Sequence, residues 1–296
     1  MSRTPERVLF ATDGSEDAAL AGRAAADICR GTGAELHVVH AWQAVPTARM
    51  RSFMRSELER AGRGRLESEL ERLERAGTSP TGKYLVEGRA ADEVLDLAAR
   101  LGADLIVVGS RGLGPVGRLA LGSVAEGVIQ HASCAVLVLR GGEASWPPER
   151  VVFADDGSRP AREAGDLAAS LCATYGARGL LVHAYPRLPE TDSASRESDA
   201  RLAEDDMRLQ ERSLMQRAAE LEEYLGSRPK VRLAAGDATA YILEAAGEEA
   251  PEKTLVAVGS RGLGAIGRMR LGSVSAKTLR AARGPVLVHP PSGSAG

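Results

Sequence analysis

The two halves of this chain repeat one another. Residues 7–15, RVLFATDGS, align with residues 150–158, RVVFADDGS, and residues 109–124 align with residues 259–274 at 12 identical positions of 16. A repeat unit of about 150 residues has the length of a whole domain and far exceeds the unit of a solenoid. The 296-residue chain has room for two such domains. We therefore predict a duplicated domain.

The boundary between the two copies is predicted from turn-forming residues. The segment 141–148, GGEASWPP, contains Gly and Pro residues that continue neither a strand nor a helix. We place one domain at residues 1–142, a second at residues 149–296, and the linker at residues 143–148.

Each half alternates short apolar runs with longer stretches that have helical spacing. The run LIVV at residues 105–108 is apolar on both faces, which is typical of a central strand in a parallel sheet. Strands that alternate with helices predict an α/β fold, a parallel sheet with helices on both faces. Ligands bind such sheets at the carboxyl ends of the strands. The predicted strands lie near residues 8–12, 35–42, 83–87, 104–108 and 135–139 and, in the second half, near residues 151–154, 180–185, 231–234, 254–258 and 286–289.

Composition and charge exclude several classes of partner. The net charge is -2 and aromatic residues make up 3% of the chain, whereas nucleic-acid binding needs clustered basic surface and often stacking aromatics. No apolar run approaches the ~18 residues of a membrane span, and no signal peptide precedes the first strand. We therefore expect no nucleic-acid partner, no membrane partner and a cytoplasmic location. The 3 cysteines and 5 histidines show no metal-ligand spacing, so no metal site is expected within the protein itself.

The glycine-rich loop after the fourth predicted strand contains a misleading motif. Residues 112–117 and residues 262–267 both match the dinucleotide fingerprint G-x-G-x-x-G. That fingerprint belongs after the first strand of a βαβ unit and needs an acidic residue about 20 positions further on. Here the following strands end at Leu139 and His289 with no acidic residue. A Rossmann dinucleotide site is therefore not expected, and the P-loop pattern G-x-x-x-x-G-K-[ST] is absent from the sequence.

A wider spacing, G-x-x-G-x9-G-S, occurs in both loops, at Gly109, Gly112 and Gly122–Ser123 and again from Gly259 to Ser273. Glycines let a backbone approach a ligand closely. A Gly-Ser pair that opens a helix presents free N–H groups at its positive end, and these attract phosphate. A single Gly-Ser is often no more than a helix cap, but two nearly identical loops favour a phosphate-binding site in each half.

These features together resemble the ATP-binding members of the universal stress protein family. The shared features are the loop spacing, the Asp-Gly-Ser that begins at Asp13 and Asp156, and the Val-His-Ala that begins at Val39 and Val182. The resemblance covers nearly the whole chain as a tandem pair. It implies ATP in each half, with Mg²⁺ carried by the phosphates, and a five-stranded parallel sheet of order 3-2-1-4-5 in each half. It also implies that the halves pair through their last strands as an internal pseudo-dimer, and it leaves open whether two whole chains form a homodimer.

The resemblance further implies which residues contact ATP. Gly122 and Ser123 would hold the β- and γ-phosphates, Asp13 would accept hydrogen bonds from the ribose or adenine, and Val39 would line the adenine pocket. The equivalent residues of the second half would act alike. The complete sets are Ala11, Thr12, Asp13, Val39, Val108, Gly109, Arg111, Gly112, Gly122, Ser123 and Val124 in the first half, and Ala154, Asp155, Asp156, Val182, Val258, Gly259, Arg261, Gly262, Gly272, Ser273 and Val274 in the second.

The function that the resemblance implies is a nucleotide-dependent stress-response or signalling module. The alternative is an enzyme of the same α/β type that slowly hydrolyses ATP or transfers its phosphoryl or adenylyl group. Such an enzyme would draw positive charge from the arginines of the two loops, Arg111, Arg118, Arg261 and Arg268. No nucleophile–base set is visible in the sequence, so enzyme activity stays open. A scaffold that binds no nucleotide is the third alternative, and the intact glycines of both loops argue against it.

One substitution distinguishes the two predicted sites. Thr12 of the first half is replaced by Asp155 in the second. The extra carboxylate beside the second site predicts weaker ATP binding there, because it would repel the phosphates. His40 and His183 occupy equivalent ends of the second strand, and we expect structural hydrogen bonds from them rather than catalysis or metal binding.

Overall fold

The structure, a computed structural model, describes residues 4–43, 51–113, 121–140, 145–185, 196–260 and 271–291. In these residues each half alternates strands with α-helices. The first half consists of β1 (Arg7–Ala11), α1 (Glu16–Thr32), β2 (Glu35–Trp42), α2 (Arg51–Arg75), β3 (Gly82–Glu87), α3 (Ala90–Leu101), β4 (Leu105–Gly109), α4 (Ser123–His131) and β5 (Ala135–Leu139). The second consists of β6 (Arg150–Ala154), α5 (Arg159–Ala173), β7 (Arg178–Tyr185), α6 (Arg196–Leu225), β8 (Lys230–Ala235), α7 (Ala238–Gly247), a short 3-10 turn (Pro251–Lys253), β9 (Thr254–Gly259), α8 (Ser273–Ala281) and β10 (Val286–His289).

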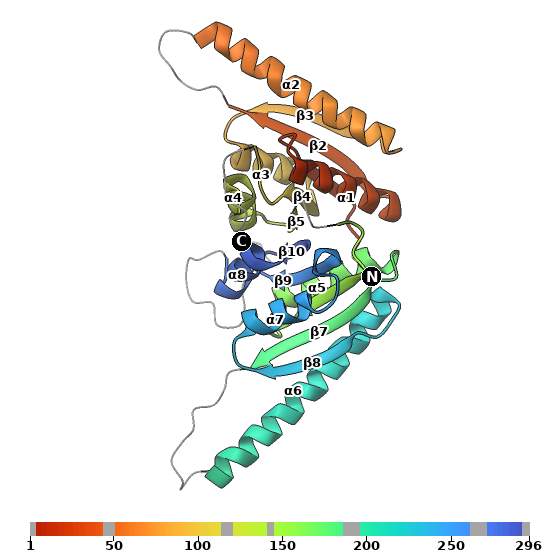
Figure 1. The fold of residues 1–296 in the computed structure, drawn as a ribbon, viewed down its shortest axis with the longest axis vertical. Coiled ribbons are helices and arrows are strands. Elements are labelled where there is room, and N and C mark those ends of the chain that lie inside the picture. The colour runs from red at the N-terminus through yellow and green to blue at the C-terminus, as the bar shows by residue number, and fades with distance from the viewer. Residues whose placement is uncertain are drawn as a thin grey trace.

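The strands of both halves form one continuous sheet (Figure 1), in the order β3-β2-β1-β4-β5-β10-β9-β6-β7-β8. Within each half every pairing is parallel. The predicted α/β fold and the strand order 3-2-1-4-5 of each half are therefore confirmed. The halves meet where β5 and β10 pair antiparallel, with Leu137 opposite Leu287. An approximate twofold axis passes through this pair of leucines and relates one half to the other.

Alternating side chains of the strands build two apolar layers, one on each face of the sheet. Val8 and Phe10 of β1 pack on the face that carries α1, α2, α5 and α6. Leu9 packs on the opposite face, which carries α3, α4, α7 and α8. Burial on both faces is what a parallel sheet requires. The long helices α2 and α6 lie at opposite ends of the molecule (Figure 1), and none of the described helices is long and apolar enough to cross a membrane.

Candidate functional site

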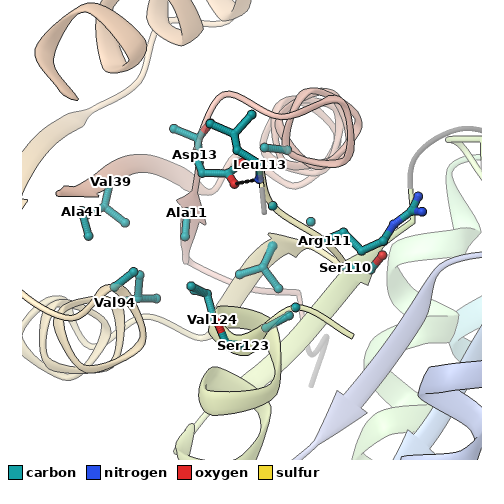
Figure 2. Close-up of a pocket in the computed structure, with 18 residues that line it drawn as sticks. Ala11, Asp13, Val39, Ala41, Val94, Ser110, Arg111, Leu113, Ser123 and Val124 are labelled. Atoms are coloured by element: carbon teal, nitrogen blue, oxygen red, sulfur yellow. Dashed lines mark hydrogen bonds between the residues drawn. The ribbon is translucent and has the colours of Figure 1, made fainter. Parts of the chain in front are cut away.

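A cavity of about 240 Å³ opens at the carboxyl ends of β1, β2 and β4 in the first half (Figure 2). All eleven residues that were predicted for the first site line it, together with Ala18, Ala41, Ala90, Val94, Ser110, Leu113 and Ala125, which were not predicted. The first group comes from motifs that repeat in the two halves. The second group is mostly small and apolar and belongs to no motif, so no pattern in the sequence marks it. That these residues contact a ligand remains a prediction.

The Asp-Gly-Ser turn joins β1 to α1 and sets one wall of this cavity. Gly14 has φ +82°, in the left-handed region that side-chain-bearing residues rarely adopt. Ser15 then caps α1, because its hydroxyl accepts the backbone N–H of Ala18 at 3.2 Å. The carboxylate of Asp13 accepts the N–H of Ser15 at 3.0 Å and, through its other oxygen, the N–H of Leu113 at 3.0 Å. Asp13 therefore bridges the turn and the glycine loop, and Figure 2 shows its bond to Leu113.

Asp17, which sequence reasoning missed, fixes the glycine loop from within the protein. Its side chain is 7% exposed. One of its oxygens accepts the hydroxyl of Ser110 at 2.8 Å and the backbone N–H of Arg111 at 3.0 Å. The guanidinium of Arg111 donates to both oxygens at 3.2 Å. One feature of the sequence marks this position: the repeat breaks there, because the residue of the second half that aligns with Asp17 is Pro160.

The direction of the Arg111 side chain corrects one expectation. Sequence reasoning placed its guanidinium among the charges that could face a nucleotide. In the structure that group is bound by Asp17, and Figure 2 shows it pointing away from the cavity. Arg111 therefore borders the cavity without directing its charge into it.

The start of α4 forms the opposite wall and is left open to solvent. Gly122 is the N-cap and provides no side-chain hydrogen bond to the helix, while Ser123 and Val124 are exposed. The first N–H groups of a helix have no intrahelical acceptor and carry partial positive charge. Gly109 also allows close packing, because an added Cβ would lie 2.9 Å from backbone atoms of Asp17 and Ala18.

The second half repeats much of this arrangement. Asp156 accepts the N–H of Ser158 at 3.0 Å, and Gly272 is again an N-cap without a side-chain hydrogen bond. Ala154 lies beside Val182 and Val258 in the sheet. Of the other predicted residues, Gly259 ends β9, and Ser273 and Val274 begin α8. Arg261, Gly262 and Arg268 lie outside the described residues, as does Arg118 of the first half.

The sequence pattern that defines the universal stress protein family matches residues 5–140 and residues 148–290. The chain belongs to this family. Both halves of the chain are therefore universal stress protein domains.

The similarity to known members of the family covers about half of this chain in some relatives and nearly all of it in others. A universal stress protein of Thermus aquaticus is 39% identical over 137 residues, which are 45% of this chain and 97% of that protein. One of Mycobacterium tuberculosis is 32% identical over 194 residues, 63% of this chain and 61% of the relative. The crystal structure of a universal stress protein from Archaeoglobus fulgidus superposes with a TM-score of 0.68 and covers 97% of this chain and 99% of that one. At 21% identity, this last likeness shows the shared fold.

The carboxylate of Asp155 is buried and neutralised, which removes the reason given for weaker binding in the second universal stress protein domain. Asp155 is 7% exposed and accepts the Nε–H of Arg217, from α6, at 3.1 Å. Arg217 also lies 2.8 Å from Asp166 and 3.2 Å from Glu220. The charge of Asp155 is thus compensated by Arg217 of α6.

The first domain has an acidic residue, Glu69, where the second has Arg217. Glu69 of α2 packs against Gly22 as Arg217 of α6 packs against the equivalent Gly165. Glu69 is 1% exposed and lies 2.7 Å from Arg72. Burial raises the pKa of Glu69, although Arg72 opposes the shift. At this position the long helix therefore contributes a buried carboxyl group in the first domain and a buried guanidinium in the second.

The two histidines of the second strands have the structural role that was expected. His40 donates from Nδ1 to the carbonyl oxygen of Thr12 at 2.7 Å, and His183 donates to that of Asp155 at 2.6 Å. A carbonyl can only accept, so Nδ1 carries the proton in both rings. Each histidine thereby fixes the end of the first strand beside the candidate site.

His40 should make the stability of the protein depend on pH. Burial lowers the pKa of His40 below its ordinary value of 6.5, although the bond to Thr12 opposes the shift. The unfolded chain then binds a proton before the folded one does, so the stabilisation by neutral His40 is present above pH 6.5 and is lost as the pH falls below that value. We expect the free energy of unfolding of wild type to fall faster than that of His40→Asn on acidification in urea titrations. Parallel profiles would contradict the assignment.

Proposed function

We propose that the protein is a nucleotide-dependent stress-response or signalling module that binds ATP in the cavity of its first domain. The observation that carries this proposal is the pairing of two unlike walls in one cavity. Val39, Val94 and Val108 give an apolar wall suited to adenine. The uncapped start of α4 and the carboxylate of Asp13 provide donors for phosphate and an acceptor for ribose hydroxyls.

The helix start is the part of the cavity that favours an anion. Backbone N–H groups of Ser123 and Val124 lie at the positive end of α4, where a phosphate gains hydrogen bonds and a favourable dipole. Among the described residues, no cluster of three or more His, Cys, Asp or Glu side chains could hold a metal ion. A Mg²⁺ ion would therefore arrive on the phosphates, with Asp13 as the nearby carboxylate.

We propose that the second domain binds ATP more weakly, for a reason different from the charge of Asp155. Asp17 holds the first loop through Ser110 and Arg111 before any ligand arrives, and such ordering lowers the entropy cost of binding. In the second domain Pro160 occupies this position and provides no carboxylate. The hydroxyl of Ser260, equivalent to Ser110, is buried without a hydrogen bond.

Asp17→Ala should weaken ATP binding to the first site about tenfold, which corresponds to about 1.4 kcal/mol. Asp17 accepts four hydrogen bonds from Ser110 and Arg111, and the loop would lose all of these. Arg111→Ala is the matched control, because it removes a guanidinium that points away from the cavity and should weaken binding less. Titration calorimetry measures both. A larger loss from Arg111→Ala would show that charge, and not loop ordering, sets the affinity.

The proposed function is tested by titrating the full-length protein with ATP, with and without Mg²⁺. We expect a tighter and a weaker site on each chain. Absence of binding at millimolar ATP under both conditions would reject the proposal. Release of ADP, followed in the same samples, would reveal hydrolysis.

A further inference from the structure

The side chain of Arg140 crosses from the first domain to the second. Arg140 directly follows β5, and its Nη2 donates to the carbonyl oxygens of Leu279 at 2.9 Å and Arg280 at 3.1 Å. These carbonyls belong to the last turn of α8. The last carbonyls of a helix receive no hydrogen bond from an N–H group of the same helix. A cation at the negative end of a helix is favourable. Arg140 thus satisfies the end of a helix that belongs to the other domain.

The twofold relation between the domains places Pro290 where a second such arginine would stand. Leu137 and Leu287 lie opposite one another on the axis, and Arg140 and Pro290 each lie three residues further along the chain. Proline has no side-chain donor. The last turn of α4, which corresponds to the last turn of α8, therefore receives no equivalent cation from position 290.

A cavity of about 170 Å³ occupies this place. It is lined by Ile129, Gln130, His131, Ala132, Ser260, Pro290 and Pro291. Ile129 and Gln130 correspond to Leu279 and Arg280, the residues whose carbonyls Arg140 binds. In the described part of the chain no side chain donates to the carbonyls of this pair. α4 and α8 lie on the same side of the central strands β5 and β10 (Figure 1).

Ser260 borders this cavity and is the counterpart of Ser110 in the first domain. It is 1% exposed, and its hydroxyl has no hydrogen-bond partner. Its counterpart Ser110 donates to Asp17 at 2.8 Å. The hydroxyl of Ser260 is closed off from solvent and has lost its acceptor because Pro160 stands where Asp17 does in the first domain. The cavity therefore offers a ligand the carbonyls of Ile129 and Gln130 rather than this hydroxyl.

We propose that this cavity binds the guanidinium or ammonium group of a small organic cation. The ligand would take the place that Arg140 fills in the twofold-related position. The acceptors offered by the cavity are neutral, namely the carbonyls of Ile129 and Gln130 at the negative end of the α4 dipole. None of the described lining residues is a carboxylate, so the site suits a monovalent cation with several N–H donors better than a divalent metal ion. The proposal is independent of nucleotide binding.

Methylguanidinium chloride is the probe that tests this site. Full-length protein is crystallised with it at low millimolar concentration, and binding is measured by ligand-observed NMR. We expect one methylguanidinium per chain, in the cavity beside Ile129 and Ser260. Tetramethylammonium, which has the same charge and no N–H donor, should not bind.

Two variants make the test specific. Pro290→Arg supplies the missing side chain and should weaken methylguanidinium binding at least tenfold. Arg140→Ala opens the related cavity at Leu279 and Arg280 and should raise the count to two per chain. Circular dichroism checks that both variants fold, and the Arg140→Ala result stands even where Pro290→Arg does not fold. An empty cavity in wild type, binding of K⁺ in its place, or undiminished binding to folded Pro290→Arg would each overturn the proposal.

Discussion

Gly122→Glu should weaken ATP binding to the first domain at least ~100-fold, a loss of about 2.7 kcal/mol. Gly122 is the N-cap of α4 and has φ -68°, so its backbone tolerates a side chain. An added Cβ would lie 3.2 Å from the carbonyl oxygen of Ser110, directly at the glycine loop. The new carboxylate would occupy the positive end of the helix and repel the phosphates that are proposed to bind there.

The matched substitutions separate steric from electrostatic effects and the first site from the second. Gly122→Ala adds the Cβ without the charge and should lose much less affinity. Gly272→Glu changes the same position of the second domain and should abolish the weaker binding event in calorimetry. Equal losses from Gly122→Glu and Gly272→Glu at the tighter site would contradict the assignment of that site to the first domain.

Arg217→Met should lower the free energy of unfolding by about 3–5 kcal/mol, the usual cost of leaving buried charges without their partner. The Arg217 side chain is 5% exposed and lies against Asp155 and Asp166, whose side chains are 6% and 12% exposed. Methionine fills a similar volume but neutralises neither carboxylate. Urea unfolding followed by circular dichroism measures the loss.

Glu69→Gln is the control at the equivalent place in the first domain. Burial raises the pKa of Glu69 because it disfavours the charged form, so a neutral amide of the same shape should cost under about 1 kcal/mol. Equal destabilisation by Arg217→Met and Glu69→Gln would contradict the account of the two clusters. If α2 packed on the second domain, Asp155 and Asp166 would lose the guanidinium of Arg217, which disfavours exchange of the two helices.

The sequence predicted the fold because its signals are local and repeated. Strand periodicity, the Asp-Gly-Ser turn and the duplicated loop fix the element order, and the order 3-2-1-4-5 followed from the family resemblance. All residues predicted for the first site border one cavity, since the carboxyl ends of neighbouring parallel strands meet at one edge.

Contacts between segments distant in sequence were not predictable in this way. Arg217 lies 62 positions from Asp155, and charged residues abound along α6, so no pattern singles it out. Asp17 resembled an ordinary first-turn acid of a helix, and its partners Ser110 and Arg111 lie over 90 positions away. A residue-by-residue comparison of the halves would have marked Asp17 and Arg140, because they align with Pro160 and Pro290.

The most direct measurement is a crystal structure of the full-length protein grown with excess ATP and Mg²⁺. The account predicts adenine against Val39 and Val108, with the phosphates on the backbone N–H groups of Ser123 and Val124. An unoccupied first cavity, with Asp13 still bonded to the N–H of Leu113 and no nucleotide at the start of α4, would contradict it.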